Sequence, residues 1–207
     1  DVRILTGFIE PHFFAGFSGG PKMVAPGLAG FETTMHLHNS TLIGNPNSTW
    51  GITDGNPIHD AIKEIARKTR VDFSIDVTIN QDHQLTSAYA GELFSTHKAS
   101  CQIAKRTAMK PVNKLFEIVV TTNSGYPLDL NLYQAVKGMS AAERIVTTGG
   151  MILCAAECRN GIPDESAYAR ALRAAATLAE VRDALATSPV RRPDDWQILS
   201  IDMSQVR

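Results

Sequence analysis

The chain of 207 residues carries 20 basic and 21 acidic side chains, for a net charge of −1, so we expect one domain and neither nucleic acid nor a membrane surface as a partner. No apolar run reaches the ~18 residues of a membrane span, and three cysteines without a CxxC pair favour a reducing, cytoplasmic location. The chain opens on Asp1 with no signal-peptide pattern, and we interpret it as a piece of a longer protein.

The first half of the chain is expected to alternate strands with helices. Pro11 disfavours helix at the residue before it, so an apolar run ends there. Asn56 and Pro57 suit the N-cap and the first position of a helix. The expected elements are a buried strand over residues 3–9, a short helix near 30–38, a loop over 40–55, a helix from Pro57, and a strand over 71–79 whose alternation leaves one face in solvent.

The second half continues the alternation. Two short apolar runs predict strands covered on both faces, and Thr177 with Glu180 matches a capping box. The expected elements are a helix over about 93–108, a buried strand at 118–120, a helix over about 130–145 capped by Asp129, and a buried strand at 151–156. We therefore expect an α/β fold with a largely parallel or mixed sheet and helices on both faces.

The most unusual stretch is the glycine-rich loop Gly16-Phe-Ser-Gly-Gly-Pro-Lys22. Glycines let backbone N–H groups converge on an anion, and a lysine adds a positive charge. A Walker A loop needs Gly before the Lys and Ser or Thr after it. Pro21 and Met23 hold those places, which argues against a P-loop NTPase. The loop predicts an anion-binding site, and the alternative is a turn that binds no ligand and takes no part in a reaction.

Histidines flank this loop on both sides. His12 follows the first expected strand, at the sheet edge where α/β proteins bind ligands. His36 and His38 would share one face of a strand and could grip one metal, whereas on a helix they point about 160° apart and only one could serve the site. The other three histidines have no metal-like spacing, and we interpret them as surface or packing residues; they are His59, His83 and His97.

A third group lies on the helix expected after Asp129. Gln134 and Lys137 are i,i+3 neighbours there, and Tyr133 and Lys137 are i,i+4 neighbours. This spacing places an amide and an ammonium on adjoining surface, and the alternative is a solvated helix face.

Taken together, these residues resemble the nickel-dependent lactate racemase family. The order and spacing of the motifs agree over almost the whole chain. The motifs are Gly7-Phe-Ile-Glu-Pro-His12, Phe14-Ala-Gly-Phe-Ser-Gly-Gly-Pro-Lys22, His38, the run from Gly125 to Gly138, Ala156-Glu157-Cys158 and Asp195-Trp196-Gln197.

The resemblance implies a nickel-pincer nucleotide, a pyridinium mononucleotide in which two sulfur arms and a ring carbon hold nickel. In the family a lysine joins this cofactor through a thioamide, and that position is Lys22. A histidine matching His38 is the fourth nickel ligand, and His12 matches one of two acid/base histidines. Further positions match residues that contact cofactor or substrate: Phe14, Tyr133, Gln134, Lys137 and Trp196.

The implied reaction is racemisation or epimerisation of a 2-hydroxy acid. The hydroxyl proton passes to a histidine and a hydride to the cofactor, and the hydride returns to the other face of the planar keto acid. Lys137 would hold the substrate carboxylate. Within the resemblance, residues 1–207 correspond to the carboxy-terminal domain of a two-domain parent. A partner amino-terminal domain, outside the chain, would supply the second histidine and an arginine.

Two further expectations follow from that reading. Pro21 departs from the basic residue usual at its position in the family motif. Phe13, Phe14 and Trp196 are expected on an exposed apolar surface that the other domain covers.

Two rival functions stay open from the residues alone. One is a metal-dependent hydrolase that uses His12, His36 and His38, although a zinc site of this kind needs three protein ligands and an open position. The other is a non-catalytic module that binds an anion or a nucleotide through the glycine-rich loop and catalyses no reaction.

Overall fold

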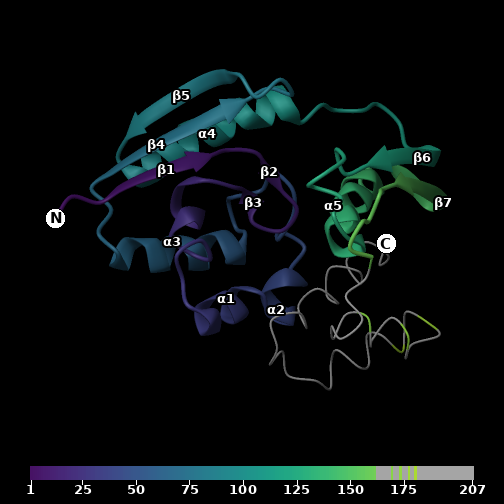
Figure 1. Cartoon of the computed structure of the whole chain (residues 1–207), viewed down its shortest axis with the longest axis horizontal. Helices are drawn as coiled ribbons and strands as arrows, with labels where there is room; N and C mark the ends of the chain where they lie inside the picture. The colour runs from purple at the N-terminus through teal and green to yellow at the C-terminus, as the bar shows by residue number, and fades with distance from the viewer. Residues whose placement is uncertain (162–168, 170–172, 174–176, 178–179, 181–207) are drawn as a thin grey trace. The chain divides into compact units, whose positions relative to one another are not determined.

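The computed structural model describes residues 1–161, 169, 173, 177 and 180 (Figure 1). The chain forms two compact units, Asp1–Pro111 and Val112–Arg207, and each is described by itself. Strands and helices alternate in both, and the sheets contain parallel and antiparallel pairs. The expected α/β class with mixed pairing is confirmed. In the part of the chain described, no helix has the length and apolar character to cross a bilayer.

The first unit is built on a three-stranded sheet in the order β1-β4-β5. β1 runs parallel to β4, and β5 pairs antiparallel with β4. Figure 1 shows α4 lying along one face of this sheet. The elements are β1 (Ile4–Phe8), β2 (Pro11–His12), β3 (Gly16–Phe17), the 3-10 helix η1 (Gly20–Met23), α1 (Phe31–Leu37), α2 (Ser40–Ile43), α3 (Pro57–Lys68), β4 (Phe73–Ile79), β5 (Leu85–Gly91) and α4 (Leu93–Ala108).

The two long helices of this unit begin where their capping residues place them. The Asn56 side chain accepts hydrogen bonds from two backbone N–H groups at the start of α3, and Pro57 takes the first helical position. Glu92 caps α4 in the same way. Such a cap is worth about 1 kcal/mol. The predicted helices from Pro57 and over 93–108 are confirmed, and α2 lies inside the stretch expected to be a loop.

Strand β4 shows the expected alternation with an unexpected orientation. Its polar residues Ser74, Asp76 and Thr78 are buried, whereas Phe73 and Ile75 are 39% and 36% exposed. The polar face lies against α4 and the glycine loop, and the apolar face is turned outward. Asp76 accepts a hydrogen bond from the loop at Gly20, and Thr78 bonds hydroxyl groups of β5. Period 2 therefore predicted the strand correctly but did not predict which face is buried.

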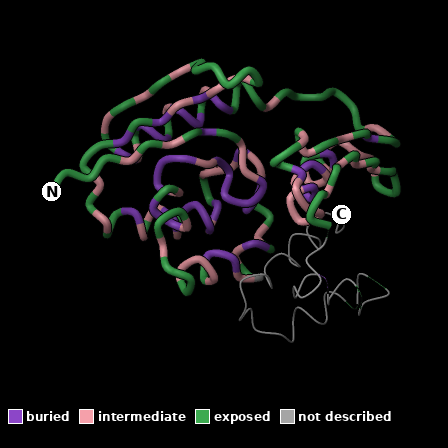
Figure 2. Tube along the Cα trace, viewed as in Figure 1, coloured by how far each residue is buried: buried purple, intermediate pink, exposed green. Residues whose placement is uncertain are grey.

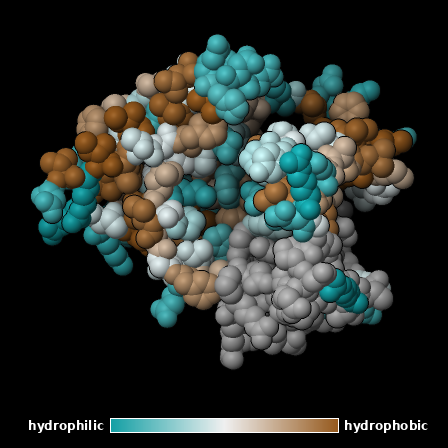
Figure 3. Space-filling view, in the orientation of Figure 1, coloured by the Kyte–Doolittle hydropathy of each residue, from teal (hydrophilic) through white to brown (hydrophobic). Residues whose placement is uncertain are grey.

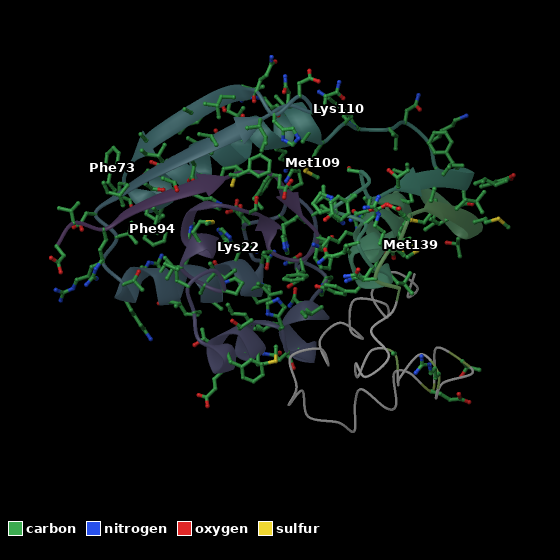
Figure 4. All side chains as sticks on the ribbon, viewed as in Figure 1. Lys22, Phe73, Phe94, Met109, Lys110 and Met139 are labelled. Atoms are coloured by element: carbon green, nitrogen blue, oxygen red, sulfur yellow. The ribbon has the colours of Figure 1, made fainter. Side chains whose placement is uncertain are left out.

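The apolar face of the sheet continues across its neighbours. In β1, Ile4 and Phe8 pair with Phe73 and Val77 and are exposed, so the expectation that residues 3–9 form a buried strand is wrong. Figure 3 shows hydrophobic surface over this sheet, and Figure 4 shows Phe73 at the start of the central strand β4.

The core of the first unit lies beneath the sheet. One cluster joins Ile9 and Phe17 to Cys101 and Ala104 of α4, with Met109 packed against it. Figure 2 shows that the segment around β2 and β3 is itself buried. Phe13 and Phe14 lie there at 9% and 4% exposure, so the expectation that they are exposed is wrong. Their rings pack against neighbouring aromatic groups of the same unit.

The second unit pairs β6 (Phe116–Thr122) in parallel with β7 (Val146–Ala155), and α5 (Leu132–Glu143) packs on both strands. Both strands were expected to be covered on two faces. That expectation is wrong, because Ile118 and Val120 are 59% and 73% exposed while Val119 is buried. Within this unit α5 covers one face of the sheet only.

The start of α5 corrects a second expectation. Asn131 caps the helix by accepting from the Gln134 N–H at 3.0 Å. Asp129 instead accepts from the Glu157 N–H at 2.9 Å, which ties the turn to the segment after β7. The capping box between Thr177 and Glu180 is confirmed by reciprocal hydrogen bonds of 3.3 Å.

Candidate functional site

His12 is held by the short hairpin of β2 and β3. Its Nδ1 accepts hydrogen bonds from the backbone N–H groups of Ala15 at 3.1 Å and Phe14 at 3.4 Å. A nitrogen that accepts carries a lone pair, so the neutral ring has its proton on Nε2. The tight turn depends on Gly16, where φ is +82° and a Cβ would collide with the Ile52 carbonyl.

The aromatic side chains around His12 form a continuous group that we call the ring cluster, consisting of His12, Phe13, Phe14 and His38. Phe14 lies between the two histidines. Its ring centroid is 4.5 Å from that of His12 and 5.3 Å from that of His38, edge-on in both cases. The structure therefore brings together two of the predicted site histidines through a predicted cofactor-packing residue.

His38 forms the C-cap of α1 and is 6% exposed. Its Nδ1 lies 2.6 Å from the Thr34 carbonyl oxygen. A carbonyl can only accept, so Nδ1 carries the proton and Nε2 carries the lone pair. Burial lowers the pKa of His38, the Thr34 carbonyl opposes that shift, and the charge of Lys22 adds to it. The ring is therefore neutral near pH 7, which is the form that binds metal.

His36 separates from His38 as a helix requires. It lies in α1 and is exposed, whereas His38 is buried. The helical alternative of the sequence argument is the one observed. Across the described residues, no three His, Cys, Asp or Glu side chains come together as a metal site, so a hydrolase centre built from His12, His36 and His38 has no support in the geometry.

Lys22 lies in η1, directly after the glycines of the loop. Gly19 and Gly20 have φ of +70° and +47°, and the Lys22 N–H donates to the Gly19 carbonyl at 3.0 Å. The lysine is half-buried, and its charge lies close enough to His38 to lower the pKa of that ring. The loop thus directs its lysine toward the ring cluster.

A buried carboxylate that the sequence motifs did not indicate holds this loop through a hydrogen bond. Asp76 of β4 is fully buried, and its Oδ1 accepts from the Gly20 N–H at 3.1 Å. Its Oδ2 has no hydrogen-bond partner among the described residues. Burial raises the pKa of this carboxyl, and the Gly20 N–H partly offsets that shift. Its signal in the sequence was a carboxylate inside an apolar strand, which alternation assigned to solvent.

The remaining predicted site residues belong to the second unit or lie outside the described residues. In α5, the Lys137 Nζ donates to the Gln134 Oε1 at 2.7 Å, which confirms that these side chains adjoin. Tyr133 is half-buried on the same helix. Their proximity to the ring cluster stays a prediction. Trp196 falls outside the described residues.

Comparisons with known proteins assign the chain to a family. Residues 1–51 match the lactate racemase N-terminal domain and residues 112–203 match the lactate racemase C-terminal domain. A lactate racemase of Thermoanaerobacterium thermosaccharolyticum is 43% identical over 169 residues, and one of Lactiplantibacillus plantarum is 41% identical over 168. The chain belongs to the lactate racemase family.

A solved structure extends the likeness to the fold. The lactate racemase apoprotein of T. thermosaccharolyticum superposes with a TM-score of 0.91 at 35% identity, over 100% of this chain and 49% of that one. The alignments with the two relatives cover 81% of this chain but span only 39% of each relative's length.

The family matches also bear on domain boundaries. The N-terminal model matches the start of the first unit, and the C-terminal model begins with the first residue of the second. The assignment of residues 1–207 to one carboxy-terminal domain stays a prediction, and these matches favour a boundary inside the chain.

Proposed function

We propose that this chain carries the cofactor site of a 2-hydroxy acid racemase or epimerase of the lactate racemase type, dependent on a nickel-pincer nucleotide. One observation supports the proposal most strongly. In a member of this family, Phe14 joins His12 and His38 in one buried cluster, and the charge of Lys22 acts on His38.

The residues fit the cofactor that the family resemblance implies. Lys22 would form the covalent link, and His38 would supply the single protein ligand of the nickel. A metal that receives its other three donors from the cofactor needs no three-residue protein site. His38 donates Nδ1–H to the Thr34 carbonyl. That outer-shell contact is typical of metal-ligating histidines, because it fixes the ring and directs the Nε2 lone pair.

When bound, the cofactor would supply the group that accepts and returns a hydride. The protein would then have to move the hydroxyl proton. His12 faces this task with its Nδ1 tied to the loop backbone and its proton on Nε2. In that state Nε2 donates a hydrogen bond to a substrate oxygen. It can accept a proton at Nε2 only after the proton moves to Nδ1, which requires the ring to leave the Phe14 and Ala15 N–H groups.

Lys137 bears on the class of substrate. Lys137 is half-buried and oriented by the Gln134 amide oxygen. An ammonium fixed in this way suits a carboxylate, which every 2-hydroxy acid carries. We propose that Lys137 binds the substrate carboxylate and Tyr133, Gln134 and Trp196 line its surroundings.

The test is turnover in a polypeptide of the length of the relatives, produced together with the enzymes that make the cofactor. We expect each enantiomer of lactate, or of another 2-hydroxy acid, to be converted to the racemic mixture. Chiral chromatography measures the two enantiomers over time. Cofactor attached and nickel bound, with no exchange of any 2-hydroxy acid, would instead favour the non-catalytic binding module. No attached cofactor in a folded protein would contradict the proposal.

A further inference from the structure

A cavity of the first unit is lined by basic side chains that the proposed racemase site does not use. It has a volume of about 330 Å³ and opens between α3 and α4. That volume falls in the range of small-molecule sites. Residues 17 and 21 of the glycine-loop segment also line it, but Lys22 and the ring cluster do not. We call this cavity the basic pocket and define it by His59, Lys63, His97, Lys98 and Lys105.

The positive groups of the basic pocket converge from two helices. His59 and Lys63 are i,i+4 neighbours on α3, and His97, Lys98 and Lys105 lie across from them on α4. Burial lowers the pKa of both histidines, and the charge of Lys63 adds to that shift. One carboxylate, Asp54, also lines the cavity. The Asp60 carboxylate, which is not among the lining residues, lies 3.7 Å from the Lys63 ammonium. The cavity is therefore positive overall.

The floor of the pocket is rigid and uncharged. His97 is buried, its Nε2 donates to the Ser18 carbonyl at 3.0 Å, and Cys101 adjoins its ring. The His59 ring stacks on it with centroids 5.6 Å apart. Burial lowers the pKa of His97 to about 4. Neutral, stacked imidazoles next to the ammonium groups of the three pocket lysines suit a ligand with an anionic part and a flat or apolar part.

An aromatic wall supports the same ligand shape. Phe94 lines the pocket from α4 and extends toward α3 (Figure 4), where the Arg67 guanidinium lies 5.3 Å from its ring centroid. Along α4, Lys98 and Lys105 are seven residues apart, which is about 10 Å at 1.5 Å per residue. Cations spread over that length match two anionic groups better than one.

We propose that the basic pocket binds a small organic phosphate with two anionic groups, of the diphosphate class. Lys98 and Lys105 would each contact one anionic group, and Lys63 would contact the group nearer the histidines. The aromatic wall and the stacked imidazoles would take the organic part. Because His97 is bonded to the Ser18 carbonyl and packs against Gly20, such a ligand would sit beneath the loop that carries Lys22.

The test is isothermal titration of the full chain with inorganic pyrophosphate, with orthophosphate for comparison. We expect saturable binding at one site, tighter for pyrophosphate, and weaker as added salt shortens the Debye length. Lys98→Ala and Lys105→Ala should each weaken pyrophosphate binding about tenfold, as the loss of a charge-assisted contact does. Both lysines are exposed at the pocket rim, so these variants should fold. Lys68→Ala, an exposed change at the end of α3 outside the pocket, is the matched control.

Three outcomes would overturn the proposal. They are no saturable pyrophosphate binding, an equal loss in the Lys68 control, and binding that survives both α4 variants but disappears in Lys22→Ala. The last result would move the anion to the proposed cofactor site and leave the racemase proposal intact. Since a missing cofactor link at Lys22 does not affect the pocket lysines, the two proposals can fail separately.

Discussion

Two groups of histidines lie near the same glycine-rich segment, and they differ in the partners of their ring nitrogens. In the ring cluster, the His38 Nδ1–H donates a hydrogen bond to the Thr34 carbonyl, and the charge of Lys22 adds to the lowering of the His38 pKa by burial. In the basic pocket, the His97 Nε2 donates to the Ser18 carbonyl, and the Cys101 sulfur lies 3.4 Å from Nε2 and 3.7 Å from Nδ1. Burial lowers the pKa of both rings. The shift alone therefore does not distinguish a metal ligand from a packing histidine, and the role of His38 as the nickel ligand stays a proposal.

The largest expected effect comes from the lysine beside the ring cluster. Lys22→Arg should abolish cofactor attachment and racemisation, because a thioamide needs the lysine amine and a guanidinium supplies only the charge. Mass spectrometry and exchange of a 2-hydroxy acid measure the two losses. Lys68→Arg should change neither. Full activity in Lys22→Arg would show that the family's chemistry does not extend to this chain.

His12→Ala should lower racemisation by roughly 10²–10⁴, the usual contribution of a positioned acid/base group. Cofactor mass and nickel content should stay unchanged, because the ring is neither the link nor the metal ligand. His36→Ala, an exposed change in α1, is the control. If His12→Ala removes nickel as well, the roles assigned to the two histidines are wrong.

His38→Ala should weaken nickel binding and leave the organic adduct on Lys22. The expected loss of affinity is at least the roughly 10–100-fold that an outer-shell partner costs. Metal analysis after dialysis, together with intact mass, measures both. Nickel retained at the level of the unchanged protein would exclude His38 as the ligand.

Gly20→Ala tests the junction between the two histidine groups. Gly20 has φ of +47°, and a Cβ there would collide with the His97 ring. We expect a loss of about 1–3 kcal/mol in the free energy of unfolding. Gly30→Ala is the matched control, since nothing lies within 4 Å of a Cβ at that position. Equal stability of the two variants in urea unfolding would contradict the packing described.

The last expected effect, which appears only as the pH is lowered, is a pH dependence of stability from the basic pocket. The pKa of His97 is about 4 in the folded chain, below its ordinary 6.5. Its contribution to stability is present above pH 6.5 and is lost as pH falls toward 4, by up to about 3 kcal/mol. His59 acts in the same direction, and Asp76, whose pKa is raised, acts in the opposite one. Urea unfolding at several pH values gives the free energy of unfolding as a function of pH. Between pH 6.5 and 4 this free energy should fall less steeply with decreasing pH for His97→Gln than for the unchanged chain. An unchanged slope would contradict the assignment.

The sequence predicted most elements, because caps and periodicity are local signals. Asn56 and Pro57 act through neighbouring residues, so the start of α3 needed no tertiary information. Burial was predicted less well. The polar side of β4 is covered because Asp76 bonds the glycine loop, a contact between residues 56 apart in sequence. Alternation contains no information about such a partner.

The candidate site residues were likewise indicated by the sequence only in part. The motifs located His12, Lys22 and His38, and the helix explains why His36 does not join them. The basic pocket was missed, because its histidines were judged by spacing to one another and not by the helices they share. His59 with Lys63, and Lys98 with Lys105, have spacings that repeat on one helix face, and that signal could have found the pocket.

The most direct test of the central claim is a peptide map of the unchanged chain, produced together with the cofactor-making enzymes. The account predicts that the peptide containing Lys22 carries the added mass of the cofactor and that no other lysine peptide does. An unmodified Lys22 in a protein that binds nickel and interconverts 2-hydroxy acid enantiomers would contradict it.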